Sequence, residues 1–214
     1  MSYAFLGWCM EVGCKLVQFR KFINRGFLIG PYCPIYGWGA IAITILLKRY
    51  TYDVLVLFVM SVLICSILEY FTSYFMEKVF HARWWDYSSK KFNINGRICL
   101  ETLIPFGLLG LVIMYITNPF LLEIYQSIPP IVIHILSGIL FIIFIVDNII
   151  SSNVISTINV EGNKLVKDNT EEITERVKQI LREKSWLHRR LIEAYPNLKD
   201  IRIKIKSKLE TKNK

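Results

Sequence analysis

The sequence predicts an all-α, polytopic integral membrane protein of about five transmembrane helices, followed by a short cytoplasmic amphipathic tail. Of the 214 residues, 53% are hydrophobic, which is more than soluble domains normally carry. The apolar residues gather in long runs before position 150, and a run of about 20 can cross a bilayer as a helix. We therefore divide the chain into a helical membrane bundle, residues 1–150, and a basic tail, residues 151–214.

Five apolar stretches make up the predicted bundle. The first is short but long enough to cross with little tilt. The second holds only about 13 apolar residues, so it either spans the bilayer or re-enters the same face. The last three are each long enough to span. The stretches cover residues 3–19, 35–47, 54–75, 98–116 and 130–150.

The basic residues predict the orientation of the chain in the cell membrane. They concentrate after the first stretch, after the third and in the tail, whereas the expected connection from Asn118 to Pro129 carries only Glu123. Lys and Arg accumulate on the cytoplasmic side of membrane proteins. Five spans, with the N-terminus outside and the C-terminus in the cytoplasm, satisfy this rule. Four spans would put the later clusters on the wrong side.

The net charge of +9 is explained by this bias and by anionic lipid headgroups. No nucleic-acid partner or cofactor is expected, because zinc-finger, Walker A and Rossmann patterns are missing from the sequence. The five cysteines are odd in number and lie mostly in or beside apolar segments, which indicates reduced thiols. No cleavable signal peptide is expected, since the first stretch lacks a basic start and already carries Glu11.

The tail holds 15 of the 26 Lys and Arg residues. Asn169 can cap a helix in which Glu172 completes a capping box. The apolar residues that follow share one face, which predicts an amphipathic helix over about 170–183. This helix either docks on anionic lipid or a partner, or packs on the loops as a solvated helix.

Four carboxylates lie inside or at the edges of the apolar stretches: Glu11, Glu69, Glu101 and Asp147. A charge in hydrocarbon costs about 3 kcal/mol on insertion scales, so such groups usually face the interior of a bundle. Helical spacing of four residues pairs Glu11 with Lys15 and Arg97 with Glu101. Asp147 has only Ser151 one turn on, so its partner is expected to come from another helix.

Two polar stretches contain more functional groups than ordinary connections need. The first, residues 24–39, has four glycines and two prolines, which prevent a continuous helix. Non-helical backbone at membrane depth is tolerated only where protein or water satisfies it. The stretch is therefore a candidate binding element beside Arg25 and Cys33, or alternatively an interfacial turn anchored by aromatic residues.

The second polar stretch runs from Arg83 to Leu100 and interleaves tryptophan and tyrosine with charged and amide residues. Both stretches lie on the cytoplasmic side in the predicted topology, so they can meet. Arg25, Arg83 and Arg97 then either clamp an anion such as a lipid phosphate or neutralise the membrane carboxylates. The candidate substrate-binding residues are Glu11, Arg25, Cys33, Tyr36, Glu69, Arg83, Trp85, Asp86, Tyr87, Asn93, Arg97 and Glu101.

Enzymatic chemistry has weaker support. Cys33 and Cys99 lie beside arginines that would lower a thiol pKa, and His81 lies near the second stretch. Asp86 could contribute to a metal site at a lipid phosphate. No spacing establishes either arrangement, so we assign no catalytic residue and no metal ligand. His134 is expected to be a hydrogen-bonded packing residue.

Several motifs resemble those of one bacterial membrane family. They are Gly7-Trp8 with Glu11, NRGFLIGPYCPIYGWGA, LEYFTSYFMEKVF, RWWDYS, FNINGRICL and, in the tail, RRLIEAYPNL. In these motifs the sequence resembles the family named "putative ABC-transporter type IV", or CmpB-like, over most of its length. The resemblance implies a permease subunit that works with a separate ATPase. Five spans are few for a transport pathway, which favours a homodimer.

Three hypotheses of function follow. The first is a non-enzymatic, permease-like transport subunit with a polar intramembrane site. The second is a membrane-embedded enzyme that handles lipids, in which the same arginines bind phosphate. The third is a non-catalytic assembly or regulatory subunit whose ionic network is purely structural. The sequence leaves the substrate open.

Overall fold

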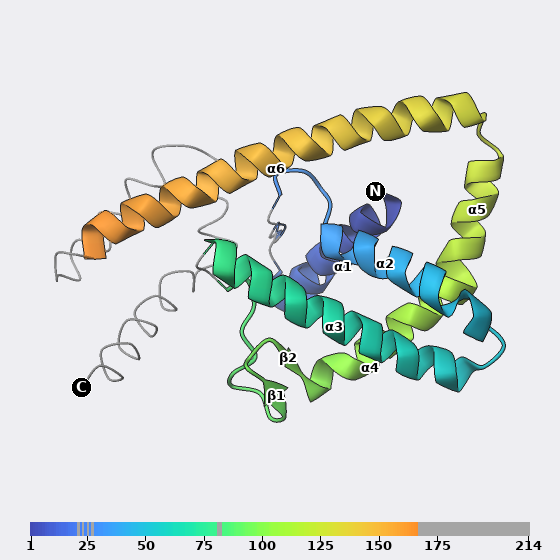
Figure 1. Ribbon diagram of the computed structural model, residues 1–214, viewed down its shortest axis with the longest axis horizontal. Helices are drawn as coiled ribbons and strands as arrows, with labels where there is room; N and C mark the ends of the chain where they lie inside the picture. Colours follow the sequence, from blue (N-terminus) through green and yellow to red (C-terminus); the bar gives the residue numbers. More distant parts are fainter. Residues whose placement is uncertain (21, 23, 25, 27, 81–82, 167–214) are drawn as a thin grey trace. The chain divides into compact units, whose positions relative to one another are not determined.

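The computed structural model of the chain describes residues 1–166 except 21, 23, 25, 27, 81 and 82 (Figure 1). These residues are predominantly helical, which confirms the all-α class. The longer helices are α1 (Ser2–Phe19), α2 (Pro34–Leu47), α3 (Val54–Phe80), α4 (Leu100–Val112), α5 (Asn118–Gln126) and α6 (Pro130–Val166). Shorter elements are the 3-10 helix η1 (Lys48–Tyr50), the π-helix η2 (Ile113–Thr117) and the strands β1 (Asn93–Ile94) and β2 (Ile98–Cys99). The predicted tail helix, Arg25 and His81 lie outside the described residues.

Three helical segments of the described chain are long and apolar enough to cross a membrane: Val54–Phe80, Leu100–Gln126 and Pro130–Val154. They correspond to the third, fourth and fifth predicted stretches. Helix α2, with 14 residues, is about 21 Å long, short of a hydrocarbon core of about 30 Å. The count of five spans therefore stays a prediction.

The predicted connection from Asn118 to Pro129 is wrong over most of its length. Helices α4, η2 and α5 follow one another directly from Leu100 to Gln126, which leaves only residues 127–129 between α5 and α6. Pro119 lies in the first turn of α5, where its missing N–H costs little. The widened turn of η2 lets the helical path continue into α5. Pro119 therefore does not mark the end of the helical stretch.

The chain forms two compact units, described separately. Unit 1 comprises Met1–Gly7, Tyr32–Tyr74 and Trp85–Ile145, and unit 2 comprises Trp8–Pro31, Phe75–Trp84 and the chain from Val146 onward. The division cuts through α1, α3 and α6. This division is a different one from the predicted boundary between a membrane bundle and a tail at residue 150. The predicted boundary stays a prediction.

The core of unit 1 lies where α2, the first half of α3 and η2 meet. Its buried side chains are Ala40, Ile43, Leu47, Leu57, Cys65, Ile113 and Met114. Helix α4 approaches α3 closely at two glycines. A Cβ added at Gly107 would lie 2.3 Å from the Phe58 ring, and one at Gly110 would lie 2.0 Å from Ser61 Oγ. The missing side chains thus let the two helix backbones come together.

Helix α2 begins beside the first turns of α1. The Cys33 N–H donates to the Ala4 carbonyl at 2.8 Å, and the Tyr36 side chain occupies the space where a Cβ of Gly7 would lie. If α1 and α2 were two successive antiparallel spans, the end of α2, and not its start, would lie beside the start of α1. The first two helices therefore do not form the simple up-and-down pair that the hydropathy pattern indicates.

We expect Gly110→Ala to destabilise the bundle. The new methyl group would overlap the Ser61 side chain and force α4 away from α3, at a cost of about 1–3 kcal/mol. The measurement is the midpoint of denaturation in mixed micelles of increasing SDS fraction. Gly138→Ala is the matched control, since a Cβ there meets nothing within 4 Å. Equal midpoints for the two variants would contradict the close α3–α4 contact.

Candidate functional site

A buried carboxylate of α6 holds the non-helical segment before α2 within unit 2. Asp147 is 7% exposed. Its Oδ1 accepts the Ile29 N–H at 2.9 Å and its Oδ2 accepts the Gly30 N–H at 2.8 Å. The Ser151 hydroxyl donates to Oδ1 at 2.9 Å. Both carboxylate oxygens therefore bind the protein, and their described partners include backbone amides of the segment before α2.

The local sequence explains why these amides need an acceptor. Gly30 and Pro31 stop helix formation, so the N–H groups before them lack the partners that a helix would supply. The neighbouring Leu28 is fully buried, which keeps water from replacing those partners. A carboxylate supplies charge-assisted bonds, stronger than those of a neutral acceptor. The first polar stretch is non-helical in its described residues up to Cys33, as predicted, whereas its residues 34–39 are helical and belong to α2.

The start of the same segment is tied to α1. The Trp8 indole N–H donates to Asn24 Oδ1 at 2.8 Å, and the Gly26 N–H donates to the same oxygen at 3.1 Å. Phe22 meets the Trp8 ring edge-on, with centroids 6.2 Å apart. Two motifs that are 16 residues apart in sequence thus meet in unit 2.

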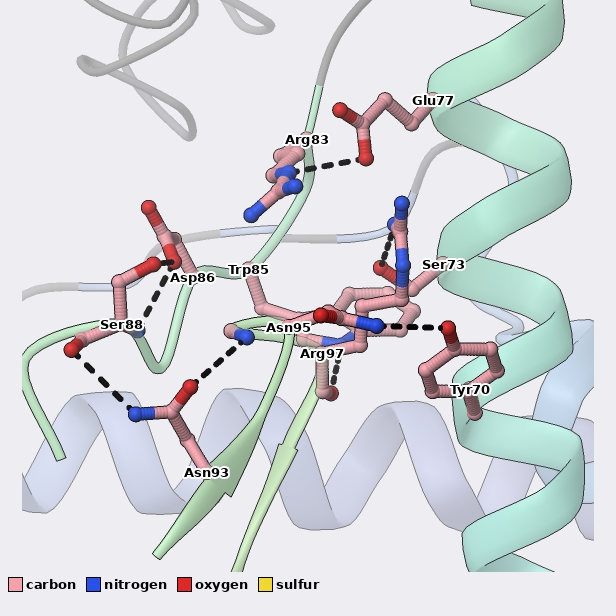
Figure 2. A network of polar contacts seen from close by, with 11 residues as sticks. Tyr70, Ser73, Glu77, Arg83, Trp85, Asp86, Ser88, Asn93, Asn95 and Arg97 are labelled. Carbon is pink, nitrogen blue, oxygen red and sulfur yellow. Dashed lines mark hydrogen bonds and ion pairs between the residues drawn. The ribbon is translucent and has the colours of Figure 1, made fainter. Parts of the chain in front are cut away.

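In unit 1, Arg97 is buried against one face of α3 (Figure 2). Its Cζ lies 5.6 Å from the ring centroid of Tyr70 and 5.4 Å from that of Tyr74. Its Nη1 donates to Ser73 Oγ at 3.4 Å. The three partners share a face because they are three and four residues apart. Aromatic faces stabilise a guanidinium when water is excluded, so this contact lets a cation lie in the protein interior.

A β-hairpin loop positions Arg97. The φ angles of Asn95 and Gly96, 53° and 68°, are those of the type I′ turn that asparagine followed by glycine favours. The Trp85 indole N–H donates to the Arg97 carbonyl at 3.1 Å, and the Tyr87 N–H donates to the Gly96 carbonyl at 2.8 Å. The aromatic part and the amide-rich part of the second polar stretch therefore fold as one loop (Figure 2).

The predicted helical pair of Arg97 and Glu101 is wrong. Arg97 lies in the hairpin, and α4 begins only at Leu100, so the spacing of four residues does not apply. The exposed Glu101 binds Lys90 Nζ at 2.8 Å instead. This contact raises the pKa of Lys90 above its ordinary value through the hydrogen bond and the charge of Glu101.

Two further charged candidates have short local contacts. In unit 2, Arg83 Nε donates to Glu77 at 2.9 Å, with both side chains about one-fifth exposed. In unit 1, the exposed Asp86 accepts the Ser88 N–H at 2.9 Å and also the Ser88 hydroxyl. The Asp86 contacts are those of a turn that closes on its own residues.

The remaining candidates are distributed over both units. Glu11 is half-buried in the unit 2 part of α1, whereas Glu69 is half-buried in the unit 1 part of α3. Cys33 precedes the first turn of α2. Because Arg25 is not described, the clamp of three arginines stays a prediction. Within the described ranges, no group of three or more His, Cys, Asp or Glu side chains could hold a metal ion.

The hydrogen bond predicted for His134 is present, but the packing is not. Its Nδ1 lies 2.6 Å from the Pro130 carbonyl oxygen, while the side chain as a whole is exposed. Lys15, which spacing pairs with Glu11, donates to Gln18 at 2.7 Å.

Sequence reasoning missed a polar cluster in unit 1. The Tyr3 hydroxyl donates to Asn118 Oδ1, and Asn118 Nδ2 donates to Thr44 Oγ1 at 3.0 Å. These bonds join α1, α2 and the start of α5. The π-helix η2 comes directly before Asn118, and such turns are frequent at functional sites. The only sequence signal is the pair Asn118-Pro119, which lies in the predicted connection.

A model of the family described as "Putative ABC-transporter type IV" matches residues 1–152. The match runs from the start of α1 well into α6 and includes Asp147, both polar stretches and the hairpin loop. Comparisons with curated proteins and with solved structures find no match.

We expect Asp147→Asn to loosen the segment before α2. The amide keeps one acceptor oxygen and turns a donor toward a backbone N–H, at a local cost of about 1–3 kcal/mol. Hydrogen exchange measured by mass spectrometry should accelerate in peptides that cover residues 28–33. Asp53→Asn is the control, because the exposed Asp53 also accepts two backbone N–H groups, those of Leu55 and Val56. Its effect should stay at the start of α3. Unchanged exchange at Ile29 and Gly30 in Asp147→Asn would contradict the role of the carboxylate.

The pair of Lys90 and Glu101 predicts a pH dependence. Because the pKa of Lys90 is raised, the pair is complete below the ordinary lysine pKa and is lost as the pH rises through the raised value. Glu101→Gln should therefore make Lys90 react faster with an acylating reagent at alkaline pH, as measured by peptide mass spectrometry. Glu123→Gln, which removes an exposed glutamate of α5, should leave the rate at Lys90 unchanged. Equal rates in all three proteins would exclude the pair in solution.

Proposed function

Because the chain belongs to the family described as "Putative ABC-transporter type IV", we propose that it is a permease-like membrane subunit of a transport assembly. The match covers residues 1–152, well over half of the chain. Within the described residues, three apolar helices of spanning length agree with a place in the membrane.

One observation carries the proposal further than the family name. The buried Asp147 carboxylate, part of a helix apolar enough to span, binds the backbone of a non-helical segment at Ile29 and Gly30. Discontinuous backbone at membrane depth is tolerated where it is buried in protein or lines a water-filled cavity. In secondary transporters, short or Gly/Pro-interrupted segments mark the substrate site. The segment before α2 is interrupted by glycine and proline, and α2 itself is short. We therefore place the transport site beside this segment.

The proposed site lies within unit 2, which contains the candidates Glu11 and Arg83 and most of the first polar stretch. In this role Glu11 and Arg83 exchange partners as the site opens. We also propose that the N-terminus lies outside and the C-terminus in the cytoplasm. Membrane lipids surround the subunit, and a second copy of the chain completes the pathway.

Energy coupling needs another polypeptide, since the sequence has no nucleotide-binding motif. We propose a separate ATPase as that partner. The competing hypothesis is a structural network, and a specific observation favours it: both oxygens of Asp147 already bind the protein. The experiment must therefore separate a loss of coupling from a loss of stability.

The test is purification of the tagged chain in native-lipid nanodiscs. We expect an ATPase subunit to copurify in a fixed ratio and to give ATP hydrolysis that vanadate inhibits. Asp147→Asn should retain the ATPase and change the rate of hydrolysis, because the site beside the held segment is altered. Asp53→Asn should leave the rate unchanged. A folded, monodisperse chain without any ATPase would overturn the proposal. Destabilisation of Asp147→Asn with an unchanged rate would instead identify scaffolding.

A further inference from the structure

The hairpin loop exposes two bulky apolar side chains next to two lysines. Phe92 is 80% exposed and Ile94 is 55% exposed, and Lys90 and Lys91 directly precede them with exposed side chains. Single exposed apolar residues are common on proteins. Here, however, four of five consecutive residues combine exposed apolar groups with cations.

The loop that carries these residues is held in place. Asn93 Nδ2 donates to the Lys90 carbonyl at 2.7 Å, and Asn93 Oδ1 accepts the Gly96 N–H at 2.9 Å. The Lys90 N–H donates to the Tyr87 carbonyl at 2.9 Å. Phe92 itself has a φ of 52°, which is unfavourable for a bulky side chain. The fold thus maintains a strained backbone with an aromatic ring turned outward, and such strain clusters where a surface has a function.

The strand register places this surface at the start of a helix that is long and apolar enough to span a membrane. Asn93 pairs with Cys99, so the next position along the hairpin is Phe92 on one side and Leu100 on the other. Leu100 is the first residue of the helical span Leu100–Gln126. Leu100, Ile104 and Leu108 are exposed and follow one face of α4 at four-residue spacing. Phe92 therefore lies where an apolar, outward face begins.

We propose that residues 90–94 form a docking surface for anionic lipid headgroups. Phe92 and Ile94 enter the boundary between headgroups and acyl chains, and the lysines contact lipid phosphates above them. An apolar group beside cations is the chemistry that recognises an anionic membrane surface. Lys90 forms an ion pair with Glu101, whereas Lys91 is in no ion pair within the described part of the chain. Lys91 therefore supplies most of the selectivity for anionic over zwitterionic lipid.

The proposal can be tested whatever the chain transports. The full chain carries a photoreactive benzoylphenylalanine in place of Phe92 and is reconstituted in nanodiscs of mixed zwitterionic and anionic phospholipid. After illumination, intact-protein mass spectrometry identifies lipid adducts. We expect adducts enriched in the anionic lipid by about fivefold over the disc composition, the factor that one lysine at an anionic surface supplies. Lys91→Glu should return the ratio to the disc composition.

Two probe positions make the result interpretable. The same photoreactive residue at Phe71, which is 63% exposed on α3, should give lipid adducts without headgroup preference. At the exposed Ser89 of the same loop, it should give few. Lipid adducts at Phe71 but none at Phe92 would overturn the proposal, as would crosslinks from Phe92 to a copurified protein. An anionic enrichment that survives Lys91→Glu would overturn the assignment of Lys91.

Discussion

Backbone that leaves the helix in or near a membrane must find a partner for every polar group, and the carboxylate of Asp147 is that partner for two N–H groups of the segment before α2. Ile29 and Gly30 donate to it from a stretch where glycine and proline exclude a helix. Unsatisfied, each buried group would cost about 1–3 kcal/mol. Asp147 and the non-helical segment therefore stabilise each other. This interaction explains why a charged residue lies in so apolar a helix as α6.

The same principle governs the second polar stretch, where the buried charge is a cation. Arg97 is surrounded by the rings of Tyr70 and Tyr74 and by the Ser73 hydroxyl. The hairpin loop that presents it is built from the asparagine–glycine turn and from bonds to main-chain atoms (Figure 2). The two polar stretches thus differ in chemistry: a carboxylate binds backbone in one, and aromatic faces bind a guanidinium in the other.

The sequence located the apolar stretches because hydropathy is a local property, and it located the broken segment because glycine and proline act locally. It failed at helix ends. An apolar run marks the part that crosses, whereas α3 and α6 continue past it into polar sequence, to Phe80 and Val166. Among the partners of Asp147 and Arg97, those distant in sequence could not be predicted either. They include main-chain amides and ring faces, and neither carries a compositional signal.

The π-helix at Ile113–Thr117 changes which face of the helical path each side chain of α5 lies on, relative to α4. A π-turn holds one residue more than an α-turn, so every side chain after it is rotated by about 100° around the axis relative to an uninterrupted helix. The small face with which α4 meets α3 through Gly107 and Gly110 is consequently not continued by α5. The helical path from α4 to α5 thereby offers two differently aimed contact faces.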